Sequence, residues 1–156
     1  MNKLDETDQS LLAALQDNDR VTMAELSKTL GVATSTLNDR LKRLLRQGLI
    51  TGFHARLSPE ALGLNLLAFV YIGWNNPKTE PLFLDRISKM AWVLECHHVT
   101  GAWNYLMKVR VGTTRDLETF LAMMKAIEGV ERTETVIVLS TAKETLALEV
   151  KDSGES

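Results

Sequence analysis

The chain has 156 residues, of which 45% are hydrophobic and 24% are charged, and its formal net charge is −2. These proportions are typical of a soluble globular protein with one compact domain or two small ones. The single cysteine, Cys96, excludes an intrachain disulfide and suits a reducing compartment. No apolar run approaches the ~20 residues that a membrane-spanning helix needs, and no signal-peptide pattern opens the chain. We therefore expect a cytoplasmic protein without a membrane partner.

The low net charge conceals a local asymmetry. Residues 34–56 contain five Lys or Arg and one Asp, a local charge of +4, whereas residues 59–156 contain ten cations and thirteen anions, a charge of −3. Contact with nucleic-acid phosphates requires a local cluster of cations. The first of these two segments is therefore the part of the chain that suits a polyanionic partner.

Two helices are predicted in the first 31 residues. The first follows the N-cap candidate Asp5 and has an apolar stripe of leucines within residues 11–15. The second begins at Thr22, whose hydroxyl can accept a hydrogen bond from the Glu25 N–H while the Glu25 carboxylate returns to the Thr22 N–H. Gly31 supplies the left-handed residue that ends this helix.

A third helix is expected to begin with Thr34 as its N-cap and to bury one stripe of leucines. At about 100° per residue, these leucines fall within roughly 60° of Leu41. The stripe consists of Leu37, Leu41, Leu44 and Leu45. The rest of the helix faces water or a partner, so the segment 22–48 has the pattern of a helix-turn-helix.

The outward face of this third helix has hydrogen-bonding residues in its N-terminal half and cations in its C-terminal half. In a helix-turn-helix, the N-terminal residues of the second helix contact base edges, and flanking cations contact phosphates. We therefore predict double-stranded DNA as a partner. The predicted contact residues are Thr34, Ser35, Thr36, Asn38, Asp39, Arg40, Lys42, Arg43 and Arg46, together with Arg56 in the segment that follows. The alternative is a solvated cationic face favoured by the helix dipole.

The segment after the third helix predicts a wing and a connector. Residues 49–57 have β character and contain Gly52, which indicates a short strand or hairpin in which His54 and Arg56 are candidates for DNA-backbone contacts. Residues 59–63 form a one-turn connector that Ser58 can cap. The predicted organisation is a DNA-binding domain over residues 1–58, this connector, a second domain over 64–150 and a loose tail over 151–156.

The second domain alternates between strand and helix patterns. Four strands are predicted over 64–74, 93–100, 105–111 and 130–140, two helices over 79–90 and 113–129, and a possible further strand over 143–150. The order βαββαβ is that of the ferredoxin-like arrangement, so the whole chain belongs to the α+β class. Both helices then lie on one face of an antiparallel sheet. Because the other face is also apolar, we expect a second copy of the chain to cover it in a symmetric dimer.

Together these features resemble the Lrp/AsnC family of bacterial and archaeal transcription regulators over nearly the whole chain. The resemblance is carried by Leu4-Asp5-x-x-Asp8, Ala24-Glu25-Leu26-Ser27, Arg40-x-x-Arg43-Leu44-x-x-x-Gly48-x-Ile50, Gly101-Ala102-Trp103-Asn104-Tyr105 and Val136-x-Val138. It implies a winged helix-turn-helix followed by an amino-acid-sensing RAM domain that dimerises through its sheet and often builds tetramers or octamers. It further implies a sequence-specific transcriptional regulator whose effector, an amino acid, binds between dimers and changes DNA affinity.

The resemblance also places the effector between the hairpin over 101–105 and the final strand. The residues expected there are Thr100, Gly101, Trp103, Asn104, Tyr105, Glu134 and Val136. For Tyr105 and Val136, ordinary sheet packing is the alternative. The family usually has an aspartate where this chain has Asn104, so a charge that could pair with an ammonium group is lost and the effector's identity stays open. Beyond this effector, no cofactor is expected.

Two other functions stay open at this point. Strand alternation sends Cys96 and His98 to one face, where they could bind a metal in a metal-responsive regulator if a partner chain added ligands. The protein could also be an amino-acid-binding dimerisation module that does not bind DNA. An enzyme is not expected, because the sequence has neither a Gly-rich phosphate loop after a strand nor a Gly-x-Ser-x-Gly motif.

Overall fold

The computed structural model of the protein describes residues 4–18 and 20–150. The described chain divides into two units, one formed by residues 4–55 and 143–150 and the other by residues 56–142. Our expected boundary near residue 60 is close to the first division. The segment 143–150, which we expected in the second domain, groups instead with the N-terminal helices. The predicted tail, 151–156, lies outside the described residues.

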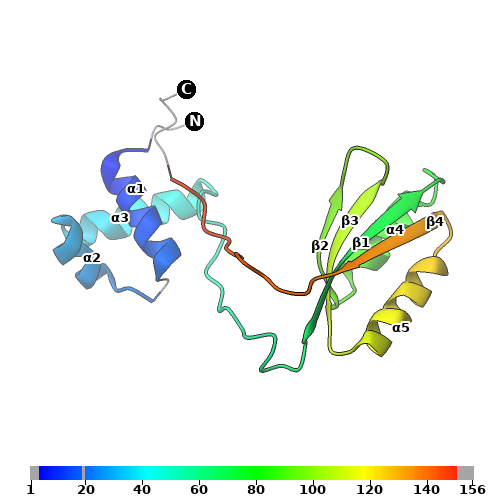
Figure 1. The fold of residues 1–156 in the computed structure, drawn as a ribbon. Coiled ribbons are helices and arrows are strands. Elements are labelled where there is room, and N and C mark those ends of the chain that lie inside the picture. The colour runs from blue at the N-terminus through cyan, green and yellow to red at the C-terminus, as the bar shows by residue number, and fades with distance from the viewer. Residues whose placement is uncertain (1–3, 19, 151–156) are drawn as a thin grey trace. The chain divides into compact units, whose positions relative to one another are not determined.

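The first unit contains three helices: α1 (Glu6–Asp17), α2 (Met23–Leu30) and α3 (Thr34–Arg46) (Figure 1). Two of the predicted caps are confirmed. Asp5 and Asp8 form a capping box at the start of α1, and Thr22 and Glu25 form another at the start of α2. Gly31 ends α2 with a φ of +66°, a left-handed conformation that glycine adopts without a Cβ clash.

The start of α3 differs from the prediction. Ala33, not Thr34, is the N-cap, and its side chain makes no capping hydrogen bond. The Leu37 N–H donates to the Ala33 carbonyl over 3.0 Å, so the first helical turn already includes Thr34. The turn after Gly31 is therefore short enough for α3 to begin one residue earlier than the threonine suggested.

The leucine stripe of α3 is also centred differently from the prediction. Leu37 and Leu44 are fully buried, whereas Leu45 is 39% exposed. On a helical wheel, Leu45 lies roughly 100° from Leu44, so one stripe cannot bury both. The core of this unit consists of Leu11, Leu12, Leu15, Leu26, Leu37 and Leu44.

Two predicted strands, one over residues 49–57 and one over residues 143–150, are not found in the described chain. Among the described residues 49–58, none lies in a strand, and Phe53 and Leu57 are 46% and 71% exposed. Residues 143–150, all described, likewise contain no strand. The backbone of Leu148 is held by the Gln16 side chain of α1, which donates to the Leu148 carbonyl over 3.0 Å and accepts from its N–H over 2.7 Å. A β pattern alone does not form a strand when no neighbouring strand offers a ladder.

The second unit has the predicted βαββαβ order. Its elements are β1 (Leu66–Trp74), α4 (Glu80–Ser88), β2 (Val93–His98), β3 (Tyr105–Val111), α5 (Thr114–Lys125) and β4 (Val130–Ile137). The strands lie in the order β2-β3-β1-β4, and every neighbouring pair is antiparallel (Figure 1). The ferredoxin-like prediction is therefore confirmed.

The two faces of this sheet differ. Alternate residues of β1 and β3 pack with α4 and α5 in one cluster, in which Val70, Met107, Phe83 and Phe120 are fully buried. The opposite face presents the other residues of the same strands, and neither helix of this unit covers it. Side chains on that face include the half-buried Phe69, Tyr71 and Leu106 and the exposed Val136. Apolar side chains are thus left uncovered on this face, beside charged residues that include Lys108 and Glu134.

Candidate DNA interface and effector site

The exposed face of α3 is the candidate DNA interface. At its N-terminal end, Ser35, Thr36 and Asp39 are exposed, and at its C-terminal end Lys42 and Arg46 are exposed. Relative to the buried stripe of Leu37 and Leu44, most of these residues lie on the opposite side of the helix. The structure therefore brings hydrogen-bonding groups and two cations together on one solvent-facing surface. Thr34 is also exposed, and Asn38 is half-buried.

Two arginines predicted for this surface point elsewhere. Arg40 donates through Nη1 to Asp5 over 2.6 Å and to Asp8 over 2.8 Å, and Arg43 donates through Nη2 to Asp8 over 2.5 Å. Both acids belong to the start of α1. Arg43, predicted to face outward, keeps a side chain that is 38% exposed, and Arg40, predicted on the flank of that face, is 23% exposed, but their guanidinium groups join α3 to α1. We refer to Asp5, Asp8, Arg40 and Arg43 as the α1–α3 ion-pair cluster.

The ion-pair cluster alters the charge properties of its members. The Arg40 guanidinium, followed by the Asp8 N–H, holds the pKa of Asp5 below its usual value. Hydrogen bonds to Asp5 and Asp8 raise the pKa of Arg40. Asp8 is only 1% exposed, and among the described residues no other charged side chain is buried. A buried carboxylate needs such partners, because burial without them is costly.

Arg56, the last predicted DNA contact, is exposed. It is the first residue of the second unit and precedes the connector. His54 is exposed as well, in the irregular segment that replaces the predicted wing strand. The side chains of His54 and Arg56 are therefore both accessible to solvent.

The candidate effector residues lie around the hairpin between β2 and β3. Asn104 joins this hairpin to the end of β1: its Oδ1 accepts from the Trp74 N–H over 2.8 Å, and its own N–H donates to the Ile72 carbonyl over 2.9 Å. The Val99 N–H donates to the Asn104 carbonyl. Asn104 thus determines where the hairpin sits relative to the sheet, a role that an aspartate oxygen could fill equally.

Trp103 takes part in an aromatic and cationic stack at the same end of the sheet. Its ring lies 5.9 Å from that of Tyr71, and the Arg132 guanidinium lies 4.3 Å from the Trp103 ring centroid. Arg132 also donates to the Ala102 carbonyl. Sequence reasoning missed Arg132. The signal that could have found it was Gly73 in β1, where a Cβ would lie 2.6 Å from the Arg132 side chain, because a glycine inside a strand often marks close approach of another group.

The remaining predicted effector residues are divided between the two faces of the sheet. Tyr105 is 3% exposed and faces the helices, where its hydroxyl donates to the Glu80 carboxylate and its ring stacks on His98 at 5.0 Å. Burial, aided by that hydrogen bond, raises the pKa of Tyr105. Glu134 and Val136 pair with Tyr71 and Phe69 respectively on the open face. Thr100 and Gly101 are exposed at the hairpin tip.

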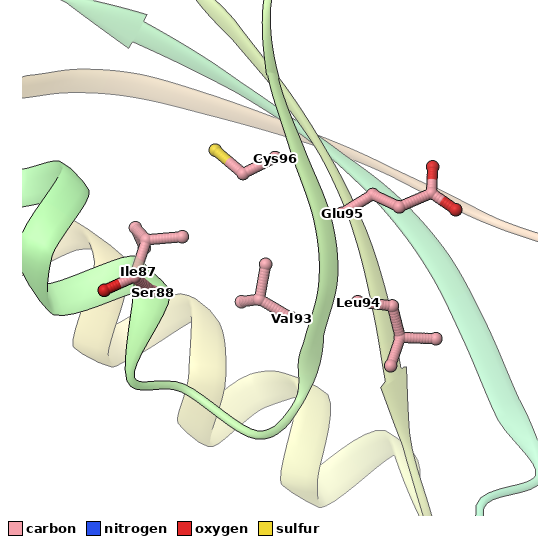
Figure 2. A pocket seen from close by; sticks show the side chains of 6 residues that line it. All are labelled: Ile87, Ser88, Val93, Leu94, Glu95 and Cys96. Carbon is pink, nitrogen blue, oxygen red and sulfur yellow. The ribbon is translucent and has the colours of Figure 1, made fainter. Parts of the chain in front are cut away.

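A pocket of about 230 Å³ lies elsewhere, between the end of α4 and the edge strand β2. Figure 2 shows Cys96 and Val93 on the same side as Ile87, with Glu95 pointing away from them. The strand register pairs Cys96 with Met107 and His98 with Tyr105, so the two share a face, as alternation predicted. Across the described part of the chain, no three His, Cys, Asp or Glu side chains are grouped so as to hold a metal. Burial raises the pKa of the Cys96 thiol.

These observations define a class of protein: a helix-turn-helix unit joined to a ferredoxin-like unit. Comparison with known families matches both parts. Residues 4–51 match a family described as winged helix-turn-helix DNA-binding, and residues 67–148 match the Lrp/AsnC ligand binding domain. Among the described residues, no helix is long and apolar enough to cross a membrane.

Relatives match nearly the whole chain. It is 39% identical over 148 residues to the HTH-type transcriptional regulator FL11 of Pyrococcus furiosus, covering 95% of this chain and 97% of that protein. It is 34% identical over 151 residues to the leucine-responsive regulatory protein of Escherichia coli, covering 95% and 92%. The chain belongs to the Lrp/AsnC family of transcriptional regulators and is a DNA-binding regulator with a ligand-binding domain.

Solved structures agree with this assignment. A transcriptional regulator of Neisseria meningitidis in complex with L-Met matches with a TM-score of 0.90 and 31% identity, over 93% of this chain and 96% of that one. AsnC of E. coli matches with a TM-score of 0.88 and 29% identity, over 94% and 99%. These matches confirm the predicted combination of a winged helix-turn-helix with a ferredoxin-like domain, although residues 49–58 of this chain form no strand.

Proposed function

We propose that this regulator binds double-stranded DNA in the cytoplasm through the exposed face of α3 and that it acts by binding, not by catalysis. The observation that carries the proposal is the arrangement of α3: the helix buries Leu37 and Leu44 while it exposes Ser35, Thr36 and Asp39 at one end and Lys42 and Arg46 at the other. The first group is placed for base edges and the second for phosphates. Thr34 and Asn38 border the first group, and Arg56 is a further candidate for a phosphate contact.

The test is the affinity of the full chain for the DNA duplex that the wild-type protein enriches from a random library. The double variant with Lys42→Gln and Arg46→Gln is expected to weaken binding on the order of tenfold, because it can no longer neutralise two phosphates. Lys78→Gln is the matched control, since Lys78 is an exposed cation of the second unit. Equal affinity of the double variant and the control would contradict this interface.

We further propose that the open face of the sheet is covered by a second copy of the chain. It supplies the apolar area that a symmetric interface requires, with Phe69, Tyr71, Leu106 and Val136 on one surface. Light scattering of Leu106→Lys tests this. The variant is expected to lose the dimer, and any tetramer or octamer built from it, whereas Leu146→Lys, at a site 84% exposed in the first unit, retains it. An unchanged mass for Leu106→Lys would contradict the proposed interface.

The effector is proposed to be an amino acid or a related small molecule bound near the hairpin of β2 and β3. Support comes from the match to a ligand-binding domain and from the neighbour solved with L-Met. The hairpin residues Thr100, Gly101, Trp103 and Asn104 offer polar and aromatic groups there, and Tyr105 follows them on β3. Glu134 and Val136 are proposed to contribute from β4, where they pair with Tyr71 and Phe69. Binding between dimers would change their relative placement and hence the affinity for DNA.

A thermal-shift screen against the common L-amino acids tests the effector site. We expect at least one amino acid to raise the melting temperature of the wild-type chain. Asn104→Ala is expected to lose this response, whereas Asn104→Asp, which keeps the acceptor for the Trp74 N–H, should still respond but to a changed set of ligands. A response of Asn104→Ala equal to that of the wild type would place the effector elsewhere.

A further inference from the structure

The α1–α3 ion-pair cluster contains the buried carboxylate of Asp8, which the DNA contacts above do not use. Asp8 lies in the first turn of α1, 1% exposed, and its partners Arg40 and Arg43 are 32 and 35 residues away in the sequence. Oδ1 accepts from Arg40 Nη1 over 2.8 Å, and both carboxylate oxygens lie 2.5 Å from Arg43 Nη2. A single buried side chain therefore holds α3 at two successive turns.

The Arg43 guanidinium binds α1 rather than a residue of its own helix. Its Nη2 is bound to Asp8, and its Nε is buried without a hydrogen-bond partner among the described residues. By contrast, Lys42 and Arg46 on the same helix are exposed. On a helical wheel, Arg46 lies roughly 170° from the buried stripe and Arg43 roughly 110°. Of the four cations in α3, Lys42 and Arg46 thus face solvent, whereas Arg40 and Arg43 bind acids of α1 with side chains that are 23% and 38% exposed.

We propose that Asp8 is a positioning residue for DNA recognition. It holds α3, through Arg40 and Arg43, in the orientation that presents Ser35, Thr36 and Asp39 to base edges. Arg40 and Arg43 act through this ion pairing and neutralise no phosphate. The proposal rests on the α3 interface proposed above. It assigns Lys42 and Arg46 to DNA phosphates, and Arg40 and Arg43 to the contact with α1.

The proposal predicts that Asp8→Asn has an effect on DNA recognition that the change of charge alone does not produce. Asp8→Asn removes a negative charge from the DNA-binding unit, which by charge alone tightens binding to any DNA. If Asp8 positions α3, the same change instead lowers the ratio of specific to non-specific affinity, because base contacts need a fixed helix orientation. We expect that ratio to fall about tenfold, the discrimination that one good base contact supplies.

The experiment measures the affinity of the full chain for the selected duplex and for a shuffled duplex of equal length and composition. Glu6→Gln is the matched control for Asp8→Asn, because it removes the same charge from an exposed position of α1. Arg43→Gln and Arg46→Gln are compared through the slope of log affinity against log salt. Arg46→Gln is expected to make the slope shallower by about 0.9 for each phosphate it no longer neutralises, and Arg43→Gln to leave it unchanged.

Three outcomes separate the possibilities. An unchanged or higher specificity ratio for Asp8→Asn, or a slope for Arg43→Gln that is as shallow as that of Arg46→Gln, would overturn the positioning role. If the wild-type chain distinguishes neither duplex and shows no salt dependence, the proposed DNA interface itself fails. Should Asp8→Asn not fold, the specificity ratio of Arg43→Gln replaces it: this change removes the guanidinium that pairs with Asp8, so a reduced ratio supports the proposal and an unchanged ratio contradicts it.

Discussion

The two units of the protein maintain their geometry in different ways. In the ferredoxin-like unit, fourteen buried residues form one core, and backbone ladders set the register of all four strands. In the helical unit, the core among the described residues contains six buried leucines, and the orientation of α3 depends in addition on the ion-pair cluster. Small units bury too little apolar surface to fix their helices by packing alone. Where a core is small, specific polar contacts can determine helix placement.

The largest expected effects come from the cores. Phe120→Ala is expected to destabilise the ferredoxin-like unit by about 3–5 kcal/mol, and Leu37→Ala the helical unit by about 2–5 kcal/mol, since both side chains are fully buried. Denaturant unfolding followed by circular dichroism measures both. Each variant should shift the transition of its own unit. If both substitutions shifted one common transition equally, the two units would not differ in the way described.

Gly129 offers a test within the ferredoxin-like unit alone. Its φ is +100°, and an added Cβ would lie 2.5 Å from the Trp74 ring, whereas at Gly101, with a φ of +110°, nothing lies within 4 Å of the added atom. Gly101→Ala therefore adds only backbone strain, about 1–2 kcal/mol. Gly129→Ala adds steric overlap of about 1–3 kcal/mol to a similar strain. Equal losses of unfolding free energy would show that packing against Trp74 is unimportant.

Capping boxes occur in both units and allow a matched comparison. The Thr22 hydroxyl accepts from the Glu25 N–H over 3.2 Å, and the Thr113 hydroxyl accepts from the Asp116 N–H over 3.2 Å. Thr22→Ala and Thr113→Ala are each expected to cost about 1 kcal/mol. The melting temperature of the helical unit should fall further, because a smaller unit has a smaller unfolding entropy. A larger fall for Thr113→Ala would reverse the comparison.

Acid is expected to have the smallest effect of these four changes. Hydrogen bonding to Arg40 lowers the pKa of Asp5, and the Thr22 N–H lowers that of Glu25. A carboxyl group whose pKa is lowered by folding adds stability above its unfolded value of about 4, and this stability is lost as the pH falls through the folded value. Thermal melts from pH 7 to pH 3 should show a loss for the helical unit that Asp5→Asn reduces. An identical pH profile for that variant would contradict the role of Asp5.

Local features could be predicted from the sequence, whereas long-range ones could not. Asp5, Thr22 and Gly31 determine helix ends through residues three or four positions away, so their roles are visible in the order of residues. The βαββαβ order likewise follows from hydrophobic periodicity, and the open sheet face follows from it. Errors arose where a partner lies far along the chain or where a strand has no neighbour.

The arginines of α3 show this most clearly. Arg40 and Arg43 have the composition of a phosphate-binding face, and only the fold reveals that Asp8 lies next to them. Arg132 was missed for the same reason, because its contact with Trp103 joins β4 to the hairpin across 29 residues of sequence. The segments 49–57 and 143–150 have strand patterns but no strand beside them among the described residues.

The central claim is that α3 presents a cationic surface to DNA phosphates. The most direct test is the slope of log affinity against log salt for the wild-type chain on its selected duplex. If two copies each contribute Lys42 and Arg46, the slope should be about −3 to −4, since each phosphate contact contributes about −0.9. A slope near zero would show that the α3 surface does not bind DNA phosphates and would contradict the claim.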